Sequence, residues 1–291
     1  MGALGAALVA WLLLVWPPPS WYRTHWPSTT AFMQLRDGQL RSARSLSPRH
    51  YRPVDPDSMS SWLGKAALAA EDAAFYRHHG IDWRALGEAI GYRRSGLSLS
   101  SAQDRQELAR AMGSAWARRD RLRGASTITL QLAKNLYLSP SRNPLRKLKE
   151  ALIAYRLEWA LPKDRILALY LNVAEFGPDL WGVEAASRTY FGKGARHLTL
   201  DEAAELIATL PHPLTSNPAY RPSRTLARAD LILRHLRGER IEIPTEEPSD
   251  SGPAPIPSPP PLPNLPIDSP PRPDSVHPPA DTAGRRVSPP A

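Results

Sequence analysis

The sequence predicts a mainly α-helical domain over about residues 57–238. Apolar residues recur at helical spacing, every three or four positions, along most of this stretch. Residues that favour helix starts and stops stand where these runs begin and end. No segment shows the alternation expected of a half-buried strand, and no internal repeat is visible. With 42% hydrophobic residues in a chain of 291, the domain has enough apolar side chains for a core.

The first helices are predicted from their caps. Asp57 or Ser58 is expected to cap a helix that stops near Gly80. Asp82 is expected to cap a second helix. A third is expected over about residues 105–121, where Leu108, Met112 and Trp116 alternate with arginines.

Helical spacing continues in the second half of the domain. Residues 126–138 form one expected helix, and Asn143 followed by Pro144 starts the next. That helix carries the clearest apolar stripe of the chain, which we expect to face the core: Leu145, Leu148, Leu152, Tyr155 and Trp159. Glu150 lies off the stripe, so it is expected to face a different environment. Further helices are expected at 163–173, 183–190, 199–210 and 223–236.

The two ends of the chain differ from the domain. Residues 1–19 hold an apolar run that is shorter than the roughly 20 residues needed to span a bilayer, followed by three prolines. We interpret it as a short uncleaved membrane anchor in preference to a buried segment or a cleaved signal peptide. Residues 20–56 are interpreted as a linker with one short element near 31–35. Residues 239–291 are predicted to be a disordered Pro-rich tail, with 17 prolines among the last 48 residues.

Positive charge is concentrated in one stretch. The formal net charge is +9, and the residues from Asp104 to Lys149 include 11 Lys/Arg and 3 Asp/Glu, which gives 11 − 3 = +8. Such a field attracts nucleic acid, anionic lipid or a phosphorylated substrate. The chain has no cysteine, which excludes disulfides, thiolate metal sites and a thiol nucleophile.

Two glutamates are candidate catalytic residues, and each has a plainer interpretation. Glu71 is either a solvated carboxylate near a helix C-terminus or, with a raised pKa, a general base. Glu150 is either a surface ion-pair partner of nearby cations or part of an anion site. His78 and His79 suggest a metal site, but no third ligand has suitable spacing, so a local hydrogen bond from His79 is the stronger interpretation.

The cations around Glu150 favour a functional interpretation, because a solvated helix face usually mixes charges of both signs. They are Lys134, Arg142, Arg146, Lys147 and Lys149. A diphosphate group would satisfy this cluster. One carboxylate that takes a proton, together with cations that hold a diphosphate, suits sugar transfer from a diphosphate donor.

Five segments, spread over about residues 62–236, resemble the ordered motifs of peptidoglycan glycosyltransferases, and of their monofunctional biosynthetic members most of all. They are EDAAFYRHHGIDW, GASTITLQLAKNLYL, RKLKEALIAYRLE, YLNVAEFGPDLWGVEAASRTYFGK and LTLDEAAELIATLPHPLTSNP. The resemblance implies a lysozyme-like, two-lobed helical fold. It also implies polymerisation of lipid II on the outer, periplasmic face of the cytoplasmic membrane, with a single-pass anchor.

The resemblance also implies roles for individual residues. Glu71 resembles the general base that deprotonates the 4-hydroxyl of the incoming GlcNAc, and Glu150 the second essential glutamate beside the donor diphosphate. Lys134, Arg142 and Lys149 match diphosphate-binding positions. Three residues match polar contacts of the second motif: Ser126, Thr127 and Gln131. A divalent cation, Mg²⁺ or Mn²⁺, is compatible with this site, and no organic cofactor is implied.

Other interpretations stay open. A glycan hydrolase would share the fold and the two glutamates, but it would not need a diphosphate site. An inactive glycan-binding scaffold would not need both glutamates. Nucleic-acid binding would explain the charge, but no nucleic-acid motif is present. The segment 91–123 is longer than the family usually has, and it is either a membrane-surface helix or an ordinary exposed insertion. Expected partners are lipid II, the growing glycan strand, the membrane and other cell-wall synthesis or division proteins.

Overall fold

The computed structural model describes residue 10 and residues 14–42, 49–92, 101–117, 126–138, 144–241 and 243–244. This part of the chain is mainly helical, as predicted. The helices are α2 (Ala31–Ser42), α3 (Ser61–Glu71), α4 (Trp83–Ile90), α5 (Ala102–Ala117), α6 (Ile128–Tyr137), α7 (Pro144–Ala160), α8 (Lys163–Val173), α9 (Val183–Phe191), α10 (Leu200–Ala208) and α11 (Ser223–Leu236). Single 3-10 turns are η1 (Pro19–Arg23), η2 (Pro56–Ser58), η3 (Phe75–Arg77) and η5 (Ala195–His197).

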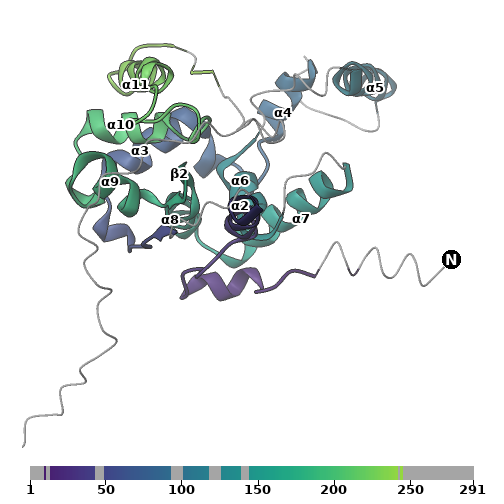
Figure 1. Ribbon diagram of the computed structural model, residues 1–291. Coiled ribbons are helices and arrows are strands. Elements are labelled where there is room, and N and C mark those ends of the chain that lie inside the picture. Colours follow the sequence, from purple (N-terminus) through teal and green to yellow (C-terminus); the bar gives the residue numbers. More distant parts are fainter. Residues whose placement is uncertain are drawn as a thin grey trace, which may run out of the picture.

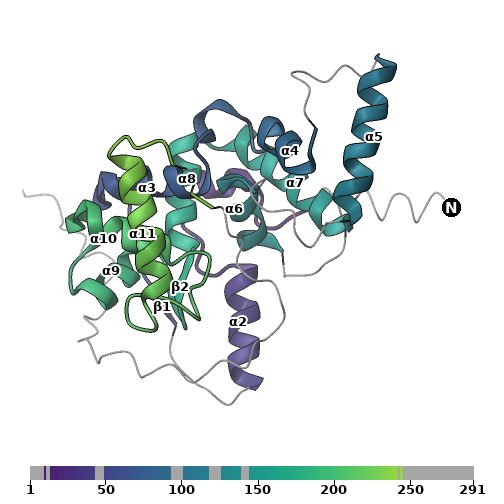
Figure 2. The same ribbon diagram turned by 90° about the horizontal axis from the view of Figure 1, so that it is seen from above.

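The helices gather in two groups. In both views α9, α10 and α11 lie on one side of the molecule and α4 and α5 on the other (Figures 1 and 2). Helix α10 packs against α3 and α11, whereas α6 packs against α7, α8 and α2. Helices α3, α6 and α8 therefore occupy the middle of the fold, between the two groups.

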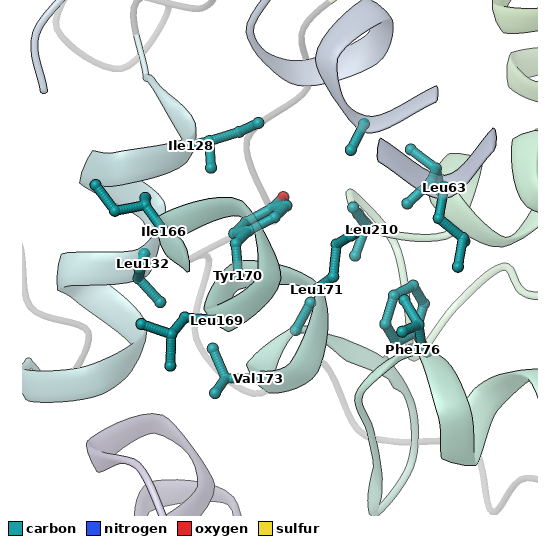
Figure 3. Close-up of a cluster of buried hydrophobic side chains, with 14 of the residues drawn as sticks. Leu63, Ile128, Leu132, Ile166, Leu169, Tyr170, Leu171, Val173, Phe176 and Leu210 are labelled. Atoms are coloured by element: carbon teal, nitrogen blue, oxygen red, sulfur yellow. The ribbon is translucent and has the colours of Figure 1, made fainter. Parts of the chain in front are cut away.

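Helix α8 provides the centre of the core. Seven of its side chains are buried, and the five large apolar or aromatic ones are Ile166, Leu169, Tyr170, Leu171 and Val173. They meet side chains from α3, α6 and the segment after α10, as Figure 3 shows. Burial on nearly all sides explains why α8 holds so few charged residues after its first turn.

A small sheet joins distant parts of the chain. Strand β1 (His50–Tyr51) pairs in parallel with β3 (Leu180–Trp181), which pairs antiparallel with β2 (Glu175–Gly177). The sequence predicts no strand. Elements of two or three residues are too short to show alternation, so the pattern could not reveal them.

The segment predicted as a linker is partly folded onto the domain, which corrects that prediction. Tyr22 and Met33 are buried in the main core. The guanidinium of Arg165 donates to the carbonyl oxygen of Tyr22 (2.8 Å), and Arg23 donates to that of Ala160 (2.8 Å). The aromatic and apolar residues between the prolines and serines therefore pack as part of the domain.

The start of α3 also differs from the prediction. Ser60 is the N-cap, accepting a hydrogen bond from the backbone N–H of Trp62, while Asp57 and Ser58 lie in η2. The helix ends at Glu71, well before Gly80, because Asp72 leaves the helical conformation. Ser58 lies only two positions before the true cap, and the local sequence does not distinguish these candidates.

The apolar stripe of α7 faces solvent, not the core as predicted. Tyr155 is 63% exposed and Trp159 86% exposed, and Leu145 and Leu148 are exposed as well. The opposite face packs inward through Ile153, Ala154 and Leu157, and Glu150 lies on that buried side. Helix periodicity located the stripe correctly but could not say what covers it.

Several predictions concern residues outside the described part. They include most of the predicted anchor, the tail from residue 245 and the side chains of Leu108, Met112 and Trp116 in α5. Within the described ranges, none of the helices has both the length and the apolar character required of a membrane span.

Gly80 has a conformation that favours glycine. Its φ is +90°, and a Cβ atom there would lie 3.3 Å from the backbone of Ala154 in α7. We expect Gly80→Ala to lower the free energy of unfolding by about 1–2 kcal/mol, the cost of left-handed backbone for an L-residue. Gly38→Ala is the control, because Gly38 lies inside α2 with open space around it. It is expected to be neutral or stabilising by up to about 1 kcal/mol. Equal urea midpoints for the two variants would contradict this account.

Candidate functional site

Glu71 is buried at the C-terminal end of α3. Its Oε1 accepts a hydrogen bond from Nη2 of Arg228 in α11 (3.0 Å), and its Oε2 accepts one from Nε2 of Gln131 in α6 (3.0 Å). Gln131 is itself held by the hydroxyl of Tyr170 in α8, which donates to its Oε1 (3.1 Å). Helices α6, α8 and α11 therefore hold both oxygens of this carboxylate in a defined position.

Burial raises the pKa of Glu71 above its ordinary value, because a carboxylate loses hydration inside the protein. The charge of Arg228, the hydrogen bonds from Gln131 and Arg228 and the charge of Lys134 act in the opposite direction. The solvated interpretation of Glu71 is therefore wrong. A buried carboxylate with an elevated pKa and a fixed orientation suits a general base.

Asp72, the next residue, connects the end of α3 to the start of α6. Its Oδ2 accepts from the backbone N–H of Ile128 (3.0 Å), and its Oδ1 lies 2.9 Å from Nε2 of His78. A carboxylate is favourable at a helix N-terminus. The local hydrogen bond predicted for His79 is made instead by His78, which is buried, whereas His79 is exposed.

Thr127 caps α6. Its side-chain oxygen accepts from the backbone N–H of Leu130 (3.1 Å), and its hydroxyl donates to the carbonyl oxygen of Gly80 (2.6 Å). Through these contacts Thr127 supports the start of α6, and Gln131 of the same helix supports Glu71 directly. Ser126 lies just before the cap and is half-buried. Direct contacts of Ser126, Thr127 and Gln131 with a substrate stay predictions.

Glu150 is buried on α7 between two cations of the same helix. Nη1 of Arg146 donates to its Oε2 (2.9 Å), and Nζ of Lys147 donates to its Oε1 (2.6 Å). The predicted ion pairs are thus confirmed, but on the buried side of the helix. The side chain of Lys147 is about half exposed, so an anion can still reach its ammonium group. Lys149 is buried, and burial lowers its pKa.

The structure places most of the predicted site residues and adds one. Two of them come from α6 and act on Glu71: Gln131 through a hydrogen bond and Lys134 through its charge. Thr127 is the N-cap of the same helix. Arg142 lies outside the described residues. Arg228 is absent from the predicted site, because one arginine among several in α11 has no distinguishing signal. It follows Glu71 by 157 positions, so only the fold reveals the contact.

Comparison with known proteins identifies relatives along most of the chain. A family model described as Transglycosylase matches residues 37–101 and 99–237. A Bordetella avium protein named biosynthetic peptidoglycan transglycosylase is 37% identical over 225 residues, which are 77% of this chain and 85% of that protein. One of the same name from Shewanella denitrificans is 43% identical over 181 residues, 62% of this chain and 68% of that protein. Penicillin-binding protein 1A of Escherichia coli is 41% identical over 189 residues, 64% of this chain and 19% of that protein.

The cap of α6 provides a stability test. Thr127→Val removes the hydroxyl at nearly constant volume, so we expect the free energy of unfolding to fall by about 1 kcal/mol, the typical cost of losing an N-cap. Thr127→Ser keeps both hydrogen bonds and is expected to stay close to the wild type. Urea unfolding followed by circular dichroism measures both variants. A Val variant as stable as the Ser variant would show that the cap contributes little.

Proposed function

The chain belongs to the transglycosylase family, and from this premise and the site geometry we propose that it is a peptidoglycan glycosyltransferase. In this proposal it polymerises lipid II into glycan strands with β-1,4 linkages between MurNAc and GlcNAc, and it releases the undecaprenyl diphosphate carrier. The observation that carries the proposal is the buried Glu71 carboxylate, held by Arg228 and Gln131 beside the cap of α6.

Glu71 acts as the general base in this reaction. Its carboxylate takes the proton from the 4-hydroxyl of the incoming GlcNAc, and that oxygen attacks the anomeric carbon of the MurNAc at the end of the growing strand. The bond from this carbon to the diphosphate breaks as the new bond forms. A single in-line displacement inverts the α-linked donor to a β-linked product.

The cations near Glu150 hold the negative charge of the leaving group. A lipid diphosphate leaves readily, so the site needs cations more than it needs an acid that protonates oxygen. Lys147 is the most accessible cation of the described cluster. Arg146 also pairs with Glu150, but its side chain is mostly buried. On the family resemblance, Lys134, Arg142 and Lys149 are assigned to the same diphosphate.

A divalent cation, Mg²⁺ or Mn²⁺, is proposed for this site on the family resemblance. Among the described residues, no group of three or more His, Cys, Asp or Glu side chains is placed to hold a metal ion. Mg²⁺ is often held by one or two carboxylates together with substrate phosphates. Glu150 would share the ion with the diphosphate, and the ion would neutralise charge on the leaving group.

Glycan hydrolysis fits the site less well. A hydrolase needs one protonated carboxylic acid that gives its proton to the leaving oxygen. The guanidinium of Arg228 favours the ionised form of Glu71, which suits proton acceptance. The cations around Glu150, which hydrolysis does not need, support transfer over hydrolysis.

The exposed stripe of α7 supports a position at the membrane. It combines aliphatic residues toward one end with Tyr155 and Trp159 toward the other, and η1, which follows the predicted anchor, packs against the same helix. Aromatic residues favour the interface between lipid and water. We assign the stripe to the outer leaflet of the cytoplasmic membrane, with a single-pass anchor and a lysozyme-like, two-lobed domain on the periplasmic side.

Glu71→Gln tests the base. Because Gln keeps the shape of the side chain but has one acceptor oxygen in place of two and cannot take up the proton, polymerisation of labelled lipid II is expected to fall by at least about 10²-fold. Binding of lipid II is expected to change little. Glu88→Gln is the control, since Glu88 forms an exposed ion pair on α4. Turnover retained in Glu71→Gln would remove Glu71 from this role.

Two leucines of equal exposure test the membrane face. Leu148 on α7 and Leu226 on α11 are each 49% exposed, and the chain has no cysteine, so Leu148→Cys and Leu226→Cys each accept a single environment-sensitive fluorophore. In vesicles with anionic lipid, the probe at 148 is expected to shift to shorter wavelength and to be quenched by spin-labelled lipid. The probe at 226 is expected to show neither change. Equal quenching at both positions would contradict the assignment.

A further inference from the structure

We infer that Arg228 is a positioning residue for the reaction, which favours the ionised form of the Glu71 carboxylate and fixes the oxygen that accepts the proton. This inference rests on the proposed function. It begins from the contacts of one buried guanidinium, which lies in the last helix of the domain and outside the stretch where the positive charge of the sequence is concentrated.

Arg228 holds three acceptors from two parts of the chain. Its Nη2 donates to Glu71 Oε1 (3.0 Å) and to the carbonyl oxygen of Ala70 (3.2 Å), while its Nη1 donates to the carbonyl oxygen of Pro244. Its side chain and that of Glu71 are 8% and 3% exposed, so solvent does little to screen the pair. The carbonyl oxygens of Ala70 and Pro244 orient the guanidinium. Ala70 directly precedes Glu71, the residue that the guanidinium positions.

The physical need for this cation follows from where Glu71 lies. The C-terminal end of a helix carries partial negative charge, which disfavours another anion there. Burial disfavours the ionised carboxylate further. A general base has to be ionised before it accepts a proton, so the site requires a nearby positive charge. Among the residues that the structure describes, Arg228 is the cation in direct contact with the carboxylate.

The other groups around Glu71 do not replace this contact. Lys134 of α6 acts on Glu71 through its charge, and Gln131 donates a neutral hydrogen bond. Burial first, and then the charges of Glu71 and Asp72, raise the pKa of Tyr170 of α8, which keeps this phenol neutral. Helix α10 also packs against α3, but among the described residues none of its side chains is a source of charge acting on Glu71.

The two protein donors do not use every acceptor position of the carboxylate. Arg228 donates a hydrogen bond to one lone pair of Oε1, and Gln131 donates one to a lone pair of Oε2. An ionised carboxylate has about four acceptor positions, so each oxygen keeps one more. The incoming hydroxyl would use one of these positions, in a direction that the two protein donors define. Arg228 thus sets both the charge and the orientation of the base.

The test compares Arg228→Gln, which keeps a hydrogen-bond donor without charge, with Arg228→Lys, which keeps the charge. Arg224→Ala is the control, because Arg224 is exposed one turn earlier on α11.

Without the guanidinium the pKa of Glu71 rises further, so the acid limb of kcat/KM against pH is expected to move to higher pH in Arg228→Gln. We expect kcat/KM to fall by about tenfold or more near neutrality, part of the roughly 10²- to 10⁴-fold that a positioned base contributes. Higher pH is expected to restore part of the loss, and Arg228→Lys to lie between Arg228→Gln and the wild type.

A second measurement is independent of turnover. Carbon-13 NMR of carboxyl-labelled glutamate, with the Glu71 signal assigned through Glu71→Gln, follows the titration of this group in the folded protein. Titration at higher pH in Arg228→Gln and Arg228→Lys than in wild type would support the inference. An unchanged Glu71 titration, or a loss of activity equal at every pH, would overturn it. A wild-type protein that does not polymerise lipid II would refute the proposed function, while the NMR titration would still decide whether Arg228 controls Glu71.

Discussion

Burying the Glu71 carboxylate imposes a condition that the surrounding helices have to meet. An anion removed from water needs a cation and hydrogen-bond donors, and its place at the end of α3 makes that need greater. Arg228 from α11 and Gln131 from α6 meet it, and Tyr170 from α8 holds Gln131 in turn. The packing of α10 and α11 on α3, and of α6 on α8, serves to bring these donors to one carboxylate.

A second set of contacts fixes the end of α3 relative to α6 and α7. Asp72 joins the end of α3 to the first N–H of α6, and Thr127 joins the cap of α6 to Gly80. Gly80 in turn contacts α7, the helix that carries Glu150. The two candidate glutamates are therefore connected through short polar contacts and one close backbone approach, so the relative position of base and diphosphate site is set by rigid elements.

The sequence predicts the helical class and the positions of most helices, because helical periodicity is a local property. It fails where the outcome depends on distant partners. The α7 stripe is identical in pattern to a core stripe, yet Trp159 is 86% exposed and Glu150 is buried. Tyr22 and Met33 looked like parts of a linker because the elements they pack on lie far along the chain: Arg165 binds the Tyr22 carbonyl, and α2, which holds Met33, packs against α6. The motifs locate Glu71 and Gln131, whereas the Arg228 contact exists only in the folded chain.

The proposed transfer reaction is tested most directly with the wild-type chain and labelled lipid II in detergent, followed by muramidase digestion of any product. The account predicts a polymer that muramidase converts to disaccharide units, because the enzyme joins MurNAc to GlcNAc through β-1,4 linkages. Folded protein that makes no such polymer, with Mg²⁺ or Mn²⁺ present or absent and in several detergents, would contradict the account.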